Sequence, residues 1–184
     1  MEKLKYALDH GGIPQEQLEK AVELLSYGTG KEVYIGTKRS PQSKVRFAQF
    51  LQNNLEFLRE RKYLTAREKT FLIDIVPSIA FDSNCIVLDT KVKNPVPANV
   101  SEIAELIGSN RSNTSVVINS LKRKGIVAKA ESGVENTNAK AYAIFINPHV
   151  IYAGDKENVN EALQVMFNKA MKMAVLKELP DKLF

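Results

Sequence analysis

The sequence predicts a mixed α+β fold that is mostly helical. The first observation behind this is a segment, residues 101–127, whose apolar spacing fits a helix, a tight turn and a second helix. The second is a pair of apolar stretches at 126–130 and 140–146, which read as two strands. The third is a set of apolar residues at three- and four-residue steps on either side, which predicts helical extensions at both ends.

Composition restricts the class of protein. Hydrophobic residues make up 44% and charged residues 26% of the 184 residues, a balance that can bury a core. The formal net charge of +5 fits a polyanionic partner, although charge alone is weak support. Cys85 is the only cysteine, which excludes an intrachain disulfide and a cysteine-rich zinc site. No apolar run approaches the roughly 18 residues of a membrane span, so we expect a cytoplasmic protein with no membrane contact.

The length favours one domain with extensions rather than two large domains. We therefore expect N-terminal helices and a short strand over 1–63, serving packing or dimerisation. A DNA-binding domain is expected over 64–148, and a C-terminal helix for dimerisation over 149–184.

The N-terminal part predicts two helices and one strand. Residues 14–26 form a short amphipathic helix that starts with Pro14. Residues 31–36 alternate enough to form a strand. A basic helix is expected over 42–61, where apolar residues recur at helical steps. These residues are Val45, Ala48, Leu51, Leu55 and Leu58.

The middle of the chain predicts a third helix and a strand. Thr65 with Glu68 three residues later is a capping box, in which each side chain accepts a free backbone N–H. The helix that starts there should end or kink near Val76, because Pro77 lacks a backbone donor. Residues 85–90 have strand character, and the prolines in 93–99 make a loop.

Residues 101–127 carry the functional signal. We expect Ser101 to cap the first helix, Gly108 to take a left-handed conformation in the turn, and Asn110 to cap the second helix. The inner face of the first helix is Ile103, Ala104 and Ile107. The buried stripe of the second helix is Thr114, Val117, Ile118 and Leu121.

The outer face of the second helix is then short, polar and basic. It comprises Arg111, Ser112, Asn113, Ser115, Val116, Asn119, Lys122 and Arg123. Short hydrogen-bonding side chains can reach base edges in the major groove, while basic residues around them bind phosphates. Arg111 is suited to guanine and Asn113 or Asn119 to adenine. An ordinary helical hairpin with a solvated outer face is the alternative.

Gly125 should end that helix, and the two strands follow. The polar loop 131–138 between the strands has the composition of a wing, with Lys129 and Lys140 on its flanks. The whole pattern predicts a winged helix-turn-helix with N- and C-terminal helical extensions. Its expected partner is double-stranded DNA.

Two family resemblances extend this interpretation. Residues 101–127 resemble the winged-helix core of MarR-type regulators, with a small alanine in the first helix, a glycine at the turn and a closing leucine. A longer stretch, roughly 31–170, resembles the RepL family of plasmid replication proteins. Its most specific part is Asn147-Pro148, then Gly154-Asp155, and later Leu163 and Phe167. The resemblance implies binding to a plasmid origin of replication, with host replication proteins as possible partners.

The chain departs from that family in its extra N-terminal helix and in residues 171–184. Two alternatives to a replication role therefore stay open. One is a winged-helix transcriptional regulator, and the other is a plasmid or phage partition adaptor.

Catalytic chemistry has no support in the sequence. The Gly-Lys pair at 30–31 lacks a Walker pattern, because Leu25 and Glu32 stand where Gly and Ser or Thr are required. His10 and His149 are the only histidines and are far apart, so we expect no metal, no cofactor and no DNA-nicking centre. We expect a protein that binds DNA and is not an enzyme.

A homodimer is expected from the apolar stripes outside the winged helix. The C-terminal stripe comprises Val159, Leu163, Met166, Phe167, Ala170, Met173 and Ala174. One small winged helix does not easily cover this stripe together with the stripe of residues 45–58. The alternative is that both stripes pack inside one chain.

Overall fold

The computed structural model describes residues 14–31, 33, 46–132 and 141–184. The chain divides into two compact units, residues 1–46 and 47–184. In the first unit, helix α2 spans Gln15–Thr29, follows Pro14, and ends at Gly30, whose φ of 64° is left-handed. The strand expected at 31–36 lies outside the described residues, apart from positions 31 and 33.

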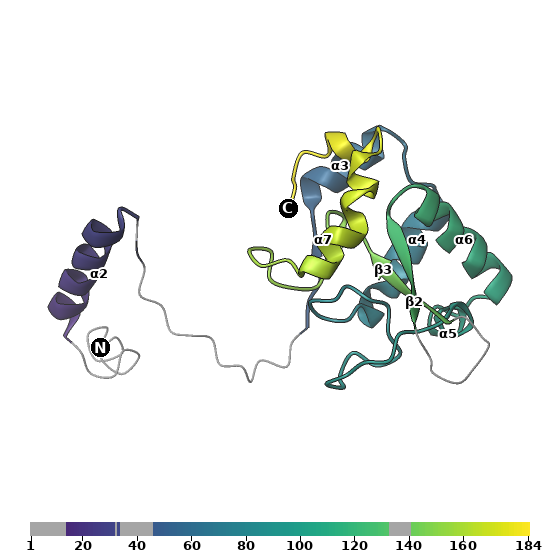
Figure 1. The fold of residues 1–184 in the computed structure, drawn as a ribbon, viewed down its shortest axis with the longest axis horizontal. Coiled ribbons are helices and arrows are strands. Elements are labelled where there is room, and N and C mark those ends of the chain that lie inside the picture. The colour runs from purple at the N-terminus through teal and green to yellow at the C-terminus, as the bar shows by residue number, and fades with distance from the viewer. Residues whose placement is uncertain (1–13, 32, 34–45, 133–140) are drawn as a thin grey trace. The chain divides into compact units, whose positions relative to one another are not determined.

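The second unit mixes helices and short strands (Figure 1). Its elements are β1 Gln49–Phe50, α3 Gln52–Glu60, α4 Ala66–Ile75, η1 Val76–Ser78, α5 Val100–Leu106, α6 Arg111–Arg123, β2 Val127–Ser132, β3 Ala141–Ile146, β4 Ile151–Tyr152, α7 Glu161–Asn168, η2 Ala170–Lys172 and η3 Leu176–Glu178. The elements labelled η are single 3₁₀ turns. None of the helices described in the structure is long and apolar enough to cross a membrane.

Two small antiparallel sheets organise this unit. Strands β2 and β3 pair with Val127 opposite Ile146, as the two apolar stretches predicted. Strands β1 and β4 pair with Gln49 opposite Tyr152. The strand expected at 85–90 is reduced to isolated bridges, including Cys85 with Phe145.

Helix α4 begins and ends where the sequence predicted. The Thr65 side chain accepts from the backbone N–H of Glu68 at 3.3 Å, and the Glu68 carboxylate accepts from the backbone N–H of Thr65 at 2.7 Å. Pro77 lies in the 3₁₀ turn η1 directly after the helix. The capping box and the proline stop are confirmed.

Two expected helix starts are wrong. Residues 42–45 of the helix predicted over 42–61 lie outside the described residues. In the described part the helix starts only at Gln52, because residues 49–50 are extended and pair with β4. The cap of α5 is Asn99 rather than Ser101. The Asn99 carboxamide accepts from the backbone N–H groups of Ser101 and Glu102, and Glu102 accepts from Asn99 in return. This complete capping box sets the start of α5 at Val100.

One large hydrophobic cluster joins many elements of the second unit. It joins Leu58 of α3, Phe71 of α4, Ile103 of α5, Ile118 of α6 and Leu176 of η3. The boundaries expected at 63/64 and 148/149 therefore fall inside this unit, because residues from all three segments share the same core.

The C-terminal segment is not one long helix. Helix α7 ends at Asn168 and is followed by two 3₁₀ turns. Val159, Leu163 and Phe167 are buried and pack with Tyr152 of β4. For these three residues, the alternative in which the apolar stripe packs inside one chain is correct. Because they are buried, they offer no surface for a dimer contact.

Polar side chains tie the end of the chain to α3. Asn54, fully buried, donates to the carbonyls of His149 at 2.7 Å and Asp181 at 2.8 Å. Its own carbonyl accepts from the backbone N–H of Asp181 at 2.9 Å. Because Asn54 satisfies backbone groups from two distant segments, it holds residues 147–150 and 179–184 against α3.

Candidate nucleic-acid interface

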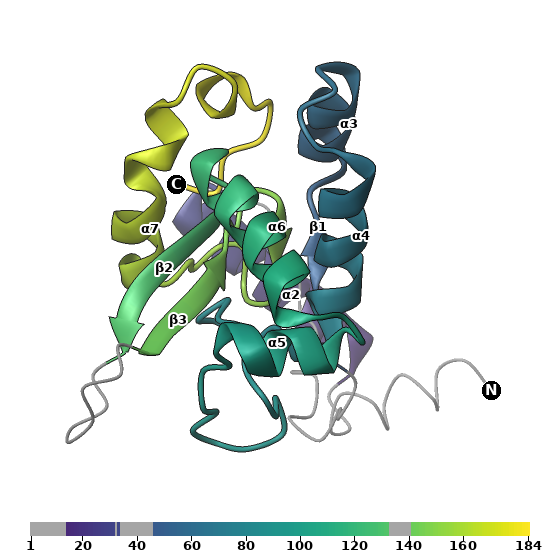
Figure 2. The same cartoon turned by 90° about the vertical axis from the view of Figure 1, so that its right-hand side faces the viewer.

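Helices α5 and α6 form the tight pair that the sequence predicted. Gly108 has a φ of 62°, and the backbone N–H of Ser109 donates to Ala104 at 2.8 Å to close the turn. The Asn110 side chain caps α6 by accepting from the backbone N–H of Asn113 at 2.8 Å. Figure 2 shows α6 crossing the front of the second unit, with α5 at its lower end and β2 beside it.

The buried stripe of α6 is confirmed. Thr114, Val117, Ile118 and Leu121 are at most 6% exposed. On the opposite side lies a line of four exposed residues at steps of four, three and four, which we call the outer row. The outer row is Ser112, Val116, Asn119 and Arg123. Arg111 and Lys122 are also exposed, and α6 contains no acidic residue.

Two of the residues predicted on the outer face lie on its flanks instead. Ser115 is half-buried on the side of β2, within 3.4 Å of the Asn119 amide nitrogen. Asn113 is half-buried on the side of α4, where it lines a pocket. Helical geometry explains this, because position 113 lies on the same face of α6 as Ser120, two turns earlier, and the Ser120 hydroxyl donates to Glu68 of α4. Lys140 lies outside the described residues.

Lys129 connects β2 to the outer row. Its ammonium donates to the Asn119 side-chain carbonyl at 2.8 Å. Burial lowers the pKa of Lys129, and the nearby positive charge of Lys122 lowers it further. The predicted contacts Asn119, Lys122 and Lys129 are therefore close together in the structure.

A third lysine, which the sequence reasoning missed, joins this group. A cavity of about 460 Å³ lies between the end of α6, β2 and the α7–η2 segment, and Lys122, Lys129 and Lys169 line it. Among the described residues that line it, three are lysines and none is acidic. No local pattern marks Lys169, because its neighbours are set by the packing of α7.

A buried carboxylate holds α6 against α4. Glu68 is 2% exposed and accepts from the Ser120 hydroxyl at 2.8 Å and the Lys124 ammonium at 2.6 Å, besides its cap contact with Thr65. Burial by itself raises the pKa of Glu68, but the hydrogen bonds from Lys124, Thr65 and Ser120 outweigh it and hold the pKa below its usual value. The sequence predicted only the capping role of Glu68.

Lys124 completes this connection. It also donates to the backbone carbonyl of Tyr63 at 2.7 Å, and the Tyr63 hydroxyl donates to the backbone carbonyl of Lys124 at 2.9 Å. The Lys124 ammonium thus contacts α4 and the segment before it. Lys122 and Arg123 are exposed instead. These contacts of Glu68, Lys124 and Tyr63 tie the C-terminal end of α6, which carries the outer row, to α4 and the segment before it.

Reactive side chains are either scattered or buried. In the parts of the chain that the structure describes, no three His, Cys, Asp or Glu residues lie together as a metal site would require. Burial raises the pKa of the Cys85 thiol to about 11, which leaves it protonated and unreactive at neutral pH. Burial lowers the pKa of His149 to about 4.

Comparisons with known proteins give one informative result. No protein-family model and no solved structure matches the chain, so the resemblance to RepL and MarR-type proteins stays a prediction. A Bacillus thuringiensis protein described as "Uncharacterized 23.6 kDa protein" is 42% identical over 185 aligned residues, covering 100% of this chain and 90% of the relative. The chain belongs to the same family as this Bacillus thuringiensis protein.

Proposed function

We propose that the chain is a sequence-specific double-stranded DNA-binding protein in which α5, α6, β2 and β3 act as a winged helix-turn-helix. The observation that carries this proposal is the outer row of α6. All four residues are exposed. The side chains of Ser112, Val116 and Asn119 are short, and the row ends in the basic residue Arg123. The absence of acidic residues from α6 and the three lysines around the cavity at its end favour a polyanion.

Each outer-row residue has a chemistry that suits a base edge or a phosphate. The Asn119 carboxamide matches the donor and acceptor of adenine, and the Val116 side chain, 59% exposed, suits the methyl group of thymine. Arg123 and Arg111 suit phosphates or guanine. The hydrogen bond from Lys129 orients the Asn119 carboxamide before DNA arrives.

The lysine cavity extends the proposed interface beyond the winged helix. Gathering Lys122, Lys129 and Lys169 around one cavity is unfavourable without an anion. A DNA phosphate neutralises this group. The α7–η2 segment then contributes to DNA affinity through Lys169, although its apolar side chains serve the core.

We further propose that the DNA site is a plasmid replication origin and that the protein binds it without cutting it. The resemblance of residues 31–170 to the RepL family supports this. A transcriptional operator and a partition site are the alternatives. Footprinting on the native plasmid or chromosome distinguishes them: protected repeats at an origin support the proposal, while an operator across a promoter or a centromere-like array overturns the replication role.

The contact surface is tested by measuring affinity at several salt concentrations on a DNA site selected from a random library. Asn119→Ala should cost about 1 to 3 kcal/mol on that site and relax the preference at one base pair. Lys122→Gln and Lys169→Gln should each weaken all sequences and lower the salt slope by about one unit.

The matched control is Lys156→Gln, which removes the same charge from an exposed position in the loop before α7. It should leave both affinity and salt slope unchanged. If specific binding survives replacement of the whole outer row by alanine, α6 does not read the DNA and the proposal is wrong.

A further inference from the structure

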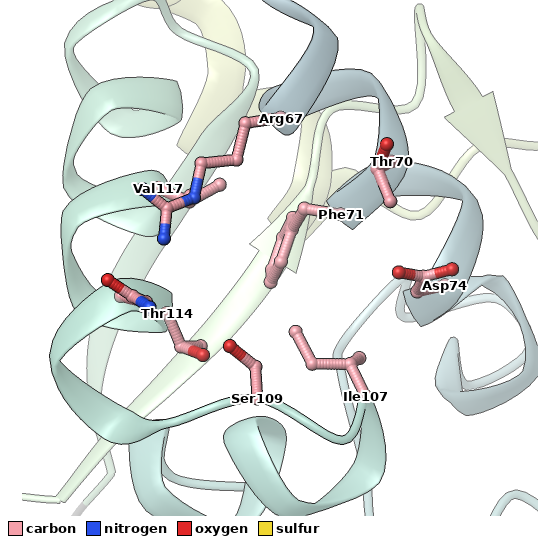
Figure 3. A pocket seen from close by; sticks show the side chains of 9 residues that line it. Arg67, Thr70, Phe71, Asp74, Ile107, Ser109, Thr114 and Val117 are labelled. Atoms are coloured by element: carbon pink, nitrogen blue, oxygen red, sulfur yellow. The ribbon is translucent and has the colours of Figure 1, made fainter.

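A second pocket lies on the other flank of α6, away from the lysine cavity. Its volume is about 200 Å³, and its walls come from α4, from the turn between α5 and α6, and from the first two turns of α6 (Figure 3). It does not include any residue of the outer row. The proposed DNA contact therefore makes no use of it.

One buried polar group in this pocket lacks a partner. Thr114 is 1% exposed, and its hydroxyl oxygen forms no hydrogen bond in the structure. Figure 3 shows this hydroxyl directed towards Ser109, into the space between α4 and the turn. Buried hydroxyls without a partner are rare because they lose their hydrogen bonds to water, so this one indicates a missing polar partner.

Two opposite charges line the same pocket. Arg67 and Asp74 are seven residues apart on α4, which is about two helical turns, or roughly 10 Å, along one face. Neither side chain forms an ion pair or hydrogen bond with any residue that the structure describes. One unpaired cation and one unpaired anion are thus available to a ligand that carries both charges at separate ends.

The volume limits the size of that ligand. A space of 200 Å³ equals the liquid volume of roughly seven water molecules, which fits a small metabolite. Phe71 supplies an apolar wall, while Asn113 and Ser109 supply polar groups. The site therefore combines a cation, an anion, a buried hydroxyl without a hydrogen-bond partner and one apolar surface.

We propose that this pocket binds a small amino acid whose carboxylate and ammonium group lie at opposite ends of the molecule, with the carboxylate at Arg67, the ammonium group at Asp74 and a polar contact to Thr114. Such a ligand touches α4 and the first turn of α6 at once. Its binding restrains the same helix that carries the outer row, so occupancy of the pocket changes DNA affinity in the proposed function.

The test measures ligand binding to the full chain without DNA, so it does not depend on the DNA-binding proposal. The probes are 4-aminobutyrate, 6-aminohexanoate and lysine, which carry an ammonium group and a carboxylate at opposite ends, with succinate and putrescine as probes of a single charge sign. At about 100 times its Kd, at least one amino acid should raise Tm by roughly 5 °C or more. Succinate and putrescine should raise it by less.

Variants separate a binding role from a structural one. Arg67→Gln and Asp74→Asn should each weaken the active amino acid about tenfold or more. Thr114→Val should weaken it as well, yet raise Tm of the ligand-free protein, because it removes an unsatisfied buried hydroxyl. Lys69→Gln, an exposed change on α4 outside this pocket, should leave affinity unchanged. The proposal is overturned if no amino acid raises Tm, or if Arg67→Gln and Asp74→Asn retain wild-type affinity.

Discussion

Replacing Glu68 with glutamine tests whether the buried carboxylate holds α6 in place. Its oxygens accept from Thr65 at 2.7 Å, from Ser120 at 2.8 Å and from Lys124 at 2.6 Å. Glutamine keeps the size and one carbonyl oxygen, but it loses the charge and turns an amide donor towards these donors. Lys124 is then left without a counterion.

The expected cost follows from the burial of the two partners. Breaking a buried ion pair on one side typically costs about 3 to 5 kcal/mol. The Lys124 side chain is 25% exposed and that of Glu68 is 3% exposed. Water can therefore solvate the unpaired lysine charge, which offsets part of the lost stability. We expect Glu68→Gln to lower the free energy of unfolding by about 2 to 3 kcal/mol, and Tm by about 5 to 10 °C.

Urea unfolding of the full chain at pH 7 measures this cost. The matched control is Glu56→Gln, which breaks an exposed ion pair with Arg59 of 2.8 Å and should cost under about 0.5 kcal/mol. Adding Lys124→Met to Glu68→Gln should recover much of the loss, since no unpaired charge remains. If Glu68→Gln costs no more than Glu56→Gln, the carboxylate does not anchor α6 and the reasoning is refuted.

The same carboxylate predicts a dependence on pH. Because the folded pKa of Glu68 lies below its unfolded value, its contribution is present above the unfolded pKa and is lost as the pH falls through the folded pKa. Glu68→Gln should therefore lower stability more at pH 7 than at strongly acidic pH. An equal loss at both pH values would contradict this.

Three further predictions concern buried groups of the second unit. His149 has a pKa of about 4 in the folded chain against 6.5 ordinarily, so stability should fall by about 3 kcal/mol as the pH drops from 6.5 to 4; His149→Gln should flatten this part of the urea-measured profile. Gly108→Ala should lower the free energy of unfolding by roughly 1 kcal/mol, because Gly108 has a positive φ. Gly125→Ala should lower it by well over this amount in thermal unfolding, because Gly125 also has a positive φ and its added Cβ would lie 2.7 Å from the core residue Leu176. Equal costs would show that the core yields there. Asn84→Ala should cost about 3 kcal/mol in urea, because Asn84 pairs with the backbone of residues 146, 151 and 153; a cost below about 1 kcal/mol would mean that these groups find other partners.

The burial of Val159, Leu163 and Phe167 changes what truncation should do. Sequence reasoning predicts that a chain ending at Asp155 is a weaker DNA binder that has lost its dimer contact. In the structure, such a chain loses Leu163 and Phe167, which cover Tyr152, and Leu176 from the main core. We expect it to unfold, which circular dichroism would show directly.

The sequence by itself determined the elements whose signals are local. The capping box of Thr65 and Glu68, the stop at Pro77 and the left-handed Gly108 each depend on residues within one turn of helix. The buried stripe of α6 follows from the helical repeat, and the pairing of β2 with β3 from two apolar stretches joined by a short polar loop.

Only the tertiary structure decided the features that join distant segments. Residues 49–50 lie in a stretch whose apolar residues have helical spacing. They nevertheless pair with β4, about 100 positions later in the chain, and form the backbone hydrogen bonds of a strand instead of those of a helix. Lys169 lies near Lys122 and Lys129 because α7 packs on β2 and β3, and Lys124 contacts Glu68 because α4 packs against α6. Periodicity shows which face of a helix is buried, but which partner covers each flank depends on contacts that no local pattern encodes.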